Sequence, residues 1–215
     1  MDDPDMSLIA FEGIDGTGKS TQAALLEKRI NDNAPGKAIR IAEPTKSPHG
    51  MKIREAMMNA KERLPFDEEL DLFIQDRKYN VEHNIKPALA ASKVVILDRY
   101  YFSTAAYQGT RGKMSWQQII DINEQFAPKP AILLVFFLPV DEALKRIDKD
   151  AKDAKRESRS YMEKKDTLEK VQAAFQQIHD SKKYNSHAID AARPVEHLQE
   201  LIWNIYQDHV RKQRA

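Results

Sequence analysis

The feature that most constrains this chain is a glycine-rich stretch, GIDGTGKS, from Gly13 to Ser20. It follows the short apolar run Leu8 to Phe11 after one intervening residue, so the expected order is a strand, a tight turn and the start of a helix. The glycines let the backbone curl until successive N–H groups point at one anion, and a helix that begins near Lys19 directs its positive end at the same place. The spacing G-x-x-x-x-G-K-S is that of a phosphate-binding P-loop. We therefore predict that this turn holds a phosphate chain, the alternative being a glycine-rich turn without a ligand.

The residues of this loop have different expected roles. Lys19 would place its ammonium group beside the outer phosphates, and the hydroxyl of Ser20 would bind Mg²⁺. The rest of the loop and the first helical turn would surround the phosphates of the nucleotide: Gly13, Ile14, Asp15, Gly16, Thr17, Gly18 and Thr21. The motif thus predicts that a nucleotide and Mg²⁺ bind here.

The bulk composition narrows the class of protein. The chain has 215 residues, enough for one α/β domain with a substantial core, and its 34 Lys and Arg residues are balanced by 33 Asp and Glu residues. Because this leaves no strongly positive field, we expect small-molecule substrates and no nucleic acid. Cysteine is absent, which excludes disulfides and a thiolate nucleophile. The N-terminus lacks the features of a signal peptide, and the longest apolar run, Ile132 to Leu138, is too short to span a bilayer, so we expect a soluble cytoplasmic protein without membrane contact.

Short apolar runs alternate with helical patterns along the chain. Four runs lack polar alternation, as expected of parallel strands covered on both faces: Leu8 to Phe11, Ala38 to Ala42, Val94 to Leu97 and Ile132 to Leu138. A fifth, short strand is expected near His187 to Ile189. The main helical patterns are Ser20 to Asp32, Gly50 to Asn59, Glu68 to Ser92 with or without a break before Pro87, Ser115 to Phe126 and Pro194 to Val210. This order predicts one P-loop NTPase-type domain over residues 1–215, an α/β fold with a doubly wound parallel sheet, helices on both faces and ligands beyond the strand C-termini.

A charged stretch at about residues 148–166 has almost no apolar face. It is either a solvated helix or a short lid over the site, and the charge pattern alone does not decide between these interpretations.

The run from Val94 to Leu97 ends in Asp98 and Arg99, which puts a carboxylate and a guanidinium at the rim of a buried strand. Asp98 at that position can orient Mg²⁺, and Arg99 can bind a phosphate through two hydrogen bonds, although a local ion pair is an alternative interpretation. The continuous string DRYYFSTAAYQGTRG, from Asp98 to Gly112, resembles the DRY-x-x-S-x-x-AYQG segment of thymidylate kinases.

Other segments match that family in the order it requires. Besides the P-loop, they are Glu43-Pro44-Thr45 after the second strand, Leu72-Phe73 and Asp76-Arg77 on a helix, and Lys145-Arg146 before the charged stretch. The resemblance extends from about Leu8 to about Leu201. It implies a homodimeric kinase that phosphorylates dTMP to dTDP with ATP and Mg²⁺.

The resemblance also assigns roles around the acceptor nucleotide. Phe73 and Arg77 are four residues apart and share one helix face. The resemblance implies that Phe73 stacks on thymine and that Arg77 binds O4 of this base. The alternative interpretation of Phe73 is an ordinary aromatic residue of the core. Gln108 is placed near the base edge and Tyr107 near the sugar, where its ring would crowd a 2′-hydroxyl. The resemblance places Asp15 beside the acceptor sugar and phosphate, and Arg54 and Arg99 near the acceptor phosphate. Ser103 is included as a substrate-binding residue because it is the serine of the matched DRY-x-x-S segment.

The remaining roles concern the donor side. Some family members carry a basic residue just after the P-loop Asp, whereas this chain has Gly16 at that position. The resemblance implies that members with Gly there take the cation from the lid instead. The available lid cations are Lys152, Lys155, Arg156 and Arg159, of which we select Arg159 as catalytic, together with Lys19, Arg99 and Asp15. Arg146 matches the arginine that stacks on adenine. The chain departs from the family pattern at Phe137, where many relatives carry Asp, at Ala42, where Arg often precedes Glu-Pro, and before Arg159, where the usual Asp is missing.

Two other functions remain open from the residues alone. One is a kinase for another nucleoside monophosphate or for a deoxynucleoside. The other is a nucleotide switch or binding module, but the guanine-reading N-K-x-D motif of such GTPases does not occur in this sequence.

Overall fold

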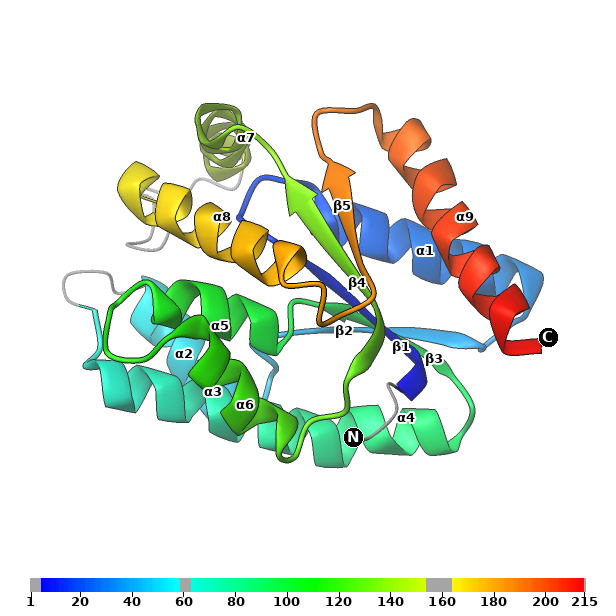
Figure 1. The fold of residues 1–215 in the computed structure, drawn as a ribbon, viewed down its shortest axis with the longest axis horizontal. Helices are drawn as coiled ribbons and strands as arrows, with labels where there is room; N and C mark the ends of the chain where they lie inside the picture. Colours follow the sequence, from blue (N-terminus) through cyan, green and yellow to red (C-terminus); the bar gives the residue numbers. More distant parts are fainter. Residues whose placement is uncertain (1–4, 59–62, 154–163, 215) are drawn as a thin grey trace.

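The computed structural model describes residues 5–58, 63–153 and 164–214, and this part of the chain contains a five-stranded parallel sheet (Figure 1). The spatial order of the strands is β2-β3-β1-β4-β5, and every neighbouring pair is parallel. The strands are β1 Asp5–Gly13, β2 Ala38–Ala42, β3 Val94–Asp98, β4 Pro130–Phe137 and β5 Ser186–Asp190. All five strands predicted from the sequence are therefore confirmed. β1 and β4 begin earlier than their predicted apolar runs, at Asp5 and Pro130, because these two residues pair with each other in the ladder.

The register of the sheet brings the predicted motifs together. Phe11 and Ala42 both lie level with Asp98 of β3, the first in the β1–β3 pair and the second in the β2–β3 pair. The segments that follow these three residues therefore leave the sheet side by side at its C-terminal edge, as expected for ligand sites of open parallel sheets.

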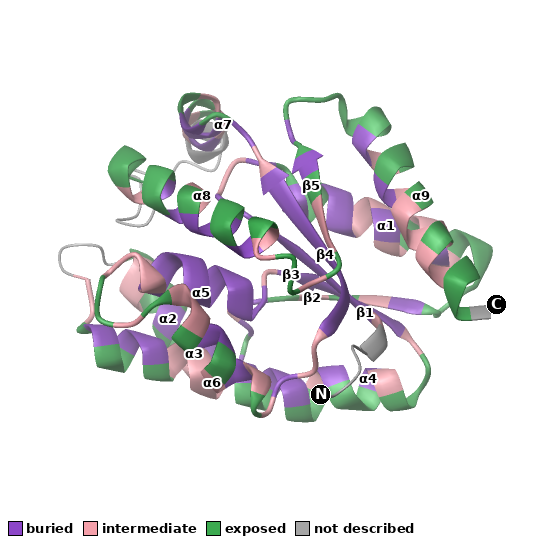
Figure 2. Cartoon of the chain, in the orientation of Figure 1, coloured by how far each residue is buried: buried purple, intermediate pink, exposed green. Residues whose placement is uncertain are grey.

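Helices cover both faces of the sheet, as predicted. In Figure 1, α1 and α9 pack against each other on one face, whereas α3, α4, α5 and α8 lie on the other. Figure 2 shows the central strands β1, β3 and β4 mostly buried, the edge strands β2 and β5 partly exposed, and the helices buried mainly on their inner faces. The helices are α1 Lys19–Asn33, α2 Pro48–Met58, α3 Phe66–Asn80, α4 Lys86–Ala90, α5 Tyr101–Gly109, α6 Trp116–Glu124, α7 Val140–Asp153, α8 Lys165–Asp180 and α9 Val195–Arg214.

The predicted helix Glu68 to Ser92 is a nearly continuous helical run that changes type before Pro87. A π-helical turn, Val81–Ile85, separates α3 from α4, and Pro87 lies in the first turn of α4. Proline lacks an N–H group and its ring clashes with the carbonyl four residues earlier in an α-helix, so the wider turn accommodates it without ending the run.

The charged stretch is partly helical. Its first residues, 148–153, continue α7, and α8 begins at Lys165. Residues 154–163, which carry the predicted lid cation Arg159, lie outside the described residues. Within the described ranges, helices long and apolar enough to cross a membrane are absent.

Candidate active site

The P-loop lies where the sequence predicts it, between β1 and the start of α1. Gly16 and Gly18 have φ angles of 79° and 81°, in the left-handed region that glycine adopts without strain. A Cβ atom on Gly16 would lie 2.5 Å from the carbonyl oxygen of Ala143 in α7, so the loop and this helix are in backbone contact. Position 16 therefore has no room for a basic side chain.

Two side chains of the loop fold back onto its own backbone. Lys19 is 5% exposed and donates from Nζ to the carbonyl oxygen of Ile14 at 2.7 Å, and Thr17 Oγ1 donates to the same oxygen at 2.9 Å. Burial, together with the nearby Arg99 guanidinium, lowers the pKa of Lys19 to about 8. Anionic phosphates are stronger partners for this ammonium group than a neutral carbonyl oxygen.

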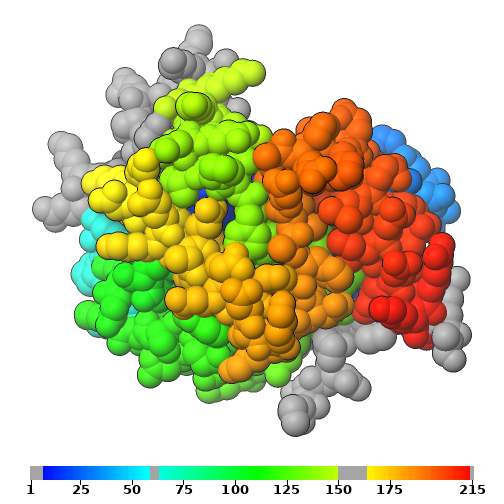
Figure 3. Space-filling model, turned by 45° about the horizontal axis from the view of Figure 1, so that its top comes forward, coloured from blue at the N-terminus to red at the C-terminus, as the bar shows by residue number. Residues whose placement is uncertain are grey.

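A cavity of about 370 Å³, which we call the phosphate cavity, opens beside the P-loop. Loop residues and two cations from α7 line it: Asp15, Gly16, Gly18, Lys19, Ser20, Thr21, Arg146 and Lys149. The space-filling view in Figure 3 shows a small patch of the blue N-terminal part of the chain at the bottom of a hollow between α7 and α8. The lining of this cavity is suited to a polyanion.

Arg146 is held at the edge of the phosphate cavity by two contacts. Its Nη1 donates to the carbonyl oxygen of Ala191 at 3.1 Å, and its Nη2 donates to Oε1 of Glu142 at 2.5 Å. The guanidinium thus lies between α7 and the segment after β5, a position compatible with stacking on the base of a nucleotide in the cavity.

The two residues predicted to bind Mg²⁺ carry oxygen atoms, the ligands that this ion prefers. Ser20 is exposed at the phosphate cavity, next to Lys19. Asp98 is 7% exposed, raises the pKa of Lys19 through its charge, and lies 3.8 Å from Nη1 of Arg40. In phosphotransferases Mg²⁺ uses one or two protein oxygens and completes its octahedron with phosphate oxygens and water. Ser20 lines the phosphate cavity and can supply a hydroxyl, whereas Asp98 is not part of that lining and is connected to it through its charge interaction with Lys19.

A second cavity, of about 90 Å³, lies between α2, α3 and α5, and we call it the acceptor cavity. Its volume holds several water-sized groups at ~10–15 Å³ each, which suits a base better than a whole triphosphate. The lining residues are Asp15, Glu43, Pro44, Met57, Phe73, Arg77, Arg99, Tyr100, Ser103, Thr104, Tyr107 and Gln108. Seven of them were predicted from the sequence as site residues: Asp15, Phe73, Arg77, Arg99, Ser103, Tyr107 and Gln108.

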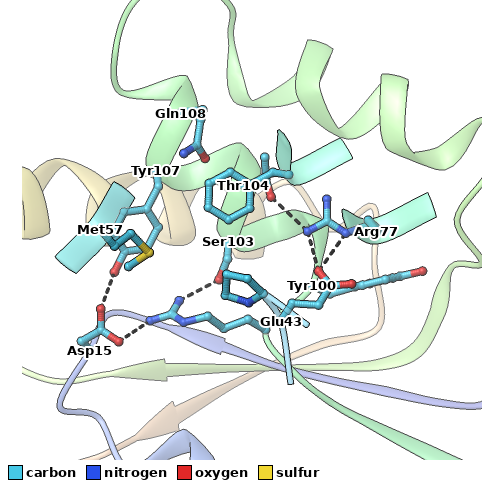
Figure 4. Close-up of a pocket in the computed structure, with 12 residues that line it drawn as sticks. Asp15, Glu43, Met57, Arg77, Tyr100, Ser103, Thr104, Tyr107 and Gln108 are labelled. Atoms are coloured by element: carbon cyan, nitrogen blue, oxygen red, sulfur yellow. Dashed lines mark hydrogen bonds and ion pairs between the residues drawn. The ribbon is translucent and has the colours of Figure 1, made fainter. Parts of the chain in front are cut away.

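The acceptor cavity has two chemically different ends (Figure 4). Asp15, Tyr107 and Met57 lie at one end, and Arg77 and Glu43 lie at the other. Asp15 also lines the phosphate cavity, so the two cavities meet at this carboxylate.

Arg77 is fixed in a buried network at its end of the cavity. The side chain is 1% exposed. Its Nε and Nη2 donate to Oε2 of Glu43 at 3.0 and 2.6 Å, Nη2 also donates to Thr104 Oγ1 at 3.0 Å, and Nη1 donates to Asn123 Oδ1 at 2.7 Å. Four of the five N–H groups of the guanidinium are thus bonded within the described part of the chain, which leaves one Nη1 donor for a ligand.

Gln108 is the polar group of the acceptor cavity that needs a ligand. Its side chain is 0% exposed, and both Nε2 and Oε1 are buried without a hydrogen-bond partner among the described residues. In Figure 4 its amide points inward among the lining side chains. Because buried amides almost always have partners, an unpaired one that lines a cavity indicates that a polar ligand supplies them.

Arg99 connects the P-loop to α5. Its φ angle is 73°, and its Nη1 donates to the carbonyl oxygen of Gly13 at 3.1 Å and to Ser103 Oγ at 2.7 Å. Its Nη2 lies 2.6 Å from Oδ1 of Asp15, whose Oδ2 accepts from the Tyr107 hydroxyl at 3.3 Å. Burial alone would raise the pKa of Asp15, but the charges of Arg99 and Lys19 outweigh it and hold that pKa at about 2. Asp15 is therefore ionised at neutral pH and fixes Arg99 where the two cavities meet.

Arg54 is the predicted acceptor residue that the structure does not place in a cavity lining. It is exposed on α2, and its Nη2 donates to the carbonyl oxygen of Pro44, which does line the acceptor cavity. Its guanidinium therefore lies at the rim of the site.

Several residues of the site were missed by the sequence analysis. Lys149 lines the phosphate cavity three residues after Arg146, whereas we sought the cation further along the chain. Glu43 was noted only as part of a matched motif. Thr104 was missed although it shares a helix face with Gln108, four residues later, and this spacing was a usable signal. Asn123 carries no such signal, because it reaches Arg77 from 46 residues away.

A P-loop at the end of a central parallel strand, a cationic phosphate cavity and an adjoining cavity that shares Asp15 with it define a P-loop nucleotide-binding enzyme with two neighbouring sites. Residues 11–202 match the family model described as thymidylate kinase. The chain belongs to the thymidylate kinase family and is a nucleoside monophosphate kinase.

Relatives of known name cover nearly the whole chain. It is 37% identical over 201 residues to a thymidylate kinase of Desulfotalea psychrophila, an alignment that covers 93% of this chain and 94% of the relative. It is 35% identical over 201 residues to a thymidylate kinase of Brachyspira hyodysenteriae, with 94% and 93% of the two chains covered. The crystal structure of thymidylate kinase from Ehrlichia chaffeensis has the same fold, with a TM-score of 0.72 at 24% identity over 94% of this chain and 98% of that one.

Proposed function

We propose that this protein transfers the γ-phosphoryl group of ATP to dTMP in the presence of Mg²⁺ and releases dTDP and ADP. The family membership supports a nucleotide acceptor. The observation that carries the choice of base is the unpaired, fully buried amide of Gln108 in a cavity that also contains Phe73 and Arg77.

The polar groups of the acceptor cavity match the edge of thymine. That edge offers an acceptor at O4 and a donor at N3, and Arg77 has one free donor while the Gln108 amide has an acceptor and donors. Cytosine presents an amino group instead of O4, which would face the donor-only guanidinium of Arg77. The ring of Phe73 supplies an apolar surface on which a base can stack.

The transfer step requires mainly that negative charge be neutralised between two anions. An oxygen of the dTMP phosphate attacks the γ-phosphorus in line, and ADP leaves. Lys19 would hold the outer phosphates of ATP, Arg99 would hold the acceptor phosphate, and Asp15 keeps Arg99 in place between them. Mg²⁺ bound near Ser20 and Asp98 would supply further charge neutralisation on the phosphates. Arg159 as the lid cation, and the homodimeric state and cytoplasmic location expected from the sequence, stay predictions.

A panel of acceptors tests the proposed function. With ATP and Mg²⁺, ADP release is expected to have its highest kcat/KM with dTMP, about tenfold or more above dUMP because one methyl group in an apolar pocket is worth ~1–3 kcal/mol. The values for dCMP, AMP and GMP should be lower still. Equal kcat/KM values for dTMP and the other four monophosphates would contradict the proposal.

Replacing Gln108 with leucine should separate substrate recognition from stability. We expect the KM for dTMP to rise about ten- to hundredfold, because a base in the cavity loses its amide partners, while the KM for ATP stays the same. The free energy of unfolding without ligand should be unchanged or higher, because the variant removes an unpaired buried amide. Steady-state kinetics and thermal unfolding measure both effects.

The matched control is Gln172→Leu. Oε1 of Gln172 in α8 is also buried without a partner among the described residues, but Gln172 is not part of the acceptor cavity lining. This variant should leave the KM for dTMP unchanged, and an equal rise in both variants would argue against a specific role of Gln108.

A further inference from the structure

Glu12 is a fully buried carboxylate that the site described above does not use. It lies in β1 immediately before the P-loop and is 0% exposed. Its Oε1 accepts from the backbone N–H groups of Tyr100 at 2.8 Å and Ser103 at 3.2 Å, and its Oε2 accepts from Ser103 Oγ at 2.5 Å. A charged group inside a strand is costly unless its partners need it, so these contacts indicate a role beyond packing.

We propose that Glu12 is a positioning residue that orients the Ser103 hydroxyl and thereby holds Arg99 in place for the phosphate of the acceptor nucleotide. This inference rests on the proposed function for the identity of that nucleotide.

The hydroxyl of Ser103 links the two charged groups. A serine hydroxyl has one donor and two acceptor lone pairs. Because the Ser103 hydroxyl donates its hydrogen bond to Oε2 of Glu12, its oxygen is oriented to accept from Nη1 of Arg99, at 2.7 Å. Without a carboxylate at position 12 the hydroxyl proton is free to point elsewhere, and the guanidinium loses a defined acceptor.

Glu12 also holds the backbone that carries Arg99. The residue before α5, Tyr100, has no side-chain cap, and Glu12 supplies from another element the acceptor that the first N–H groups of this helix need. Arg99 lies just before this point with a left-handed φ of 73°, a conformation that a non-glycine residue keeps only when its surroundings determine it. Its own N–H donates to the carbonyl oxygen of Phe11, the neighbour of Glu12.

The charges of the three groups support one another. Burial raises the pKa of Glu12 to about 7, while the Ser103 hydrogen bond and the Arg99 charge act in the opposite direction. The charged form of Glu12 thus depends on the same two residues that it orients. Two N–H groups of Arg99, on Nε and Nη2, have no partner within the described residues and remain for a phosphate.

A double-mutant cycle on Glu12→Gln and Ser103→Ala tests this link. Glutamine keeps the shape of the side chain but loses its charge and one acceptor oxygen. We expect Glu12→Gln to raise the Kd for dTMP, measured by calorimetry, about ten- to hundredfold and to leave the Kd for ATP within about twofold of the wild type. Since Glu12 acts through Ser103, the double variant should be no more than about twofold weaker than the worse single variant. Additive losses of dTMP affinity in the double variant, or an equal loss of ATP affinity in Glu12→Gln, would overturn the proposal.

A second readout needs no nucleotide. In arginine-selective ¹⁵N spectra of the ligand-free protein, the Arg99 side-chain signals should show slow rotation in the wild type and fast averaging in Glu12→Gln. Glu69→Gln is the matched control, because Glu69 is also a buried carboxylate, 1% exposed, but it pairs with Arg63 and Arg111 away from the acceptor cavity. It should lower stability and leave the Arg99 signals unchanged.

The two measurements separate the inference from the proposed function. If the wild type binds another monophosphate better than dTMP, the double-mutant cycle is run with that monophosphate. Its outcome then decides the role of Glu12, independently of the identity of the acceptor. Unchanged Arg99 signals and unchanged acceptor affinity in folded Glu12→Gln would overturn the inference whatever the acceptor is.

Discussion

Replacing Lys19 with alanine is expected to lower kcat by about three orders of magnitude or more, because placed positive charge is the main contribution of the protein to phosphoryl transfer. Lys19 is nearly buried at the P-loop, and its ammonium group now bonds only to the carbonyl oxygen of Ile14 within the described residues. The phosphates of the donor would take the place of that carbonyl. Steady-state turnover with ATP, Mg²⁺ and dTMP measures the loss.

The same variant should not be less stable than the wild type. The pKa of Lys19 falls from its ordinary 10.5 to about 8 in the folded protein, so burial of the charged form disfavours folding at neutral pH. Removing the side chain removes this cost along with the function, and the midpoint of thermal unfolding should stay the same or rise.

Lys149→Ala is the matched control for Lys19. Lys149 lines the same cavity but is exposed, so solvent and salt screen its charge, and we expect at most about a tenfold loss of kcat/KM for ATP. Equal losses in the two variants, or a Lys19→Ala turnover within tenfold of the wild type, would contradict the assignment of Lys19 to the transferring phosphates.

The sequence predicts this site well where function depends on local spacing. The P-loop spacing, the motif at the end of β3 and the four-residue separation of Phe73 and Arg77 each describe a single segment, and the structure brings all of them to one edge of the sheet. The central strands β3 and β4 were recognisable because burial on both faces requires unbroken apolar runs. The expectation of two covered faces was wrong for β2, an edge strand that is buried at Ala38 and partly exposed beyond it.

The interactions that were missed join distant segments. Glu12 meets Ser103 from 91 residues away, and Glu43 meets Arg77 from 34 residues away, so neither pair leaves a pattern along the chain. Helix α5 was not predicted from the sequence for a different reason. Eight of its nine residues are buried, and a helix covered on all sides lacks the amphipathic period by which helices are recognised.

Replacing Arg77 with leucine is expected to have the largest effect on stability. Among the described residues, the change leaves the buried carboxylate of Glu43 with only the amide of Asn80 as a partner, 2.9 Å from Oε1, and it also removes the donor to Thr104 and Asn123. Breaking a buried ion pair from one side costs ~3–5 kcal/mol, because the remaining charge is neither solvated nor paired. Urea unfolding measures the loss. Lys28→Leu breaks an exposed pair with Asp32 and should cost less than about 1 kcal/mol.

Two further measurements identify the unpaired Glu43 as the cause. Burial already raises the pKa of Glu43, and Arg77 opposes that rise, so in Arg77→Leu the pKa should rise further. A carboxyl group whose pKa is higher in the folded than in the unfolded protein loses stability as the pH rises, so the variant should be destabilised less at about pH 5 than at about pH 8. Adding Glu43→Gln to Arg77→Leu should restore part of the stability without restoring the affinity for dTMP. The stability loss could instead be the same at both pH values and not be reduced in the double variant. That result would show that lost packing, rather than the unpaired carboxylate of Glu43, causes the destabilisation.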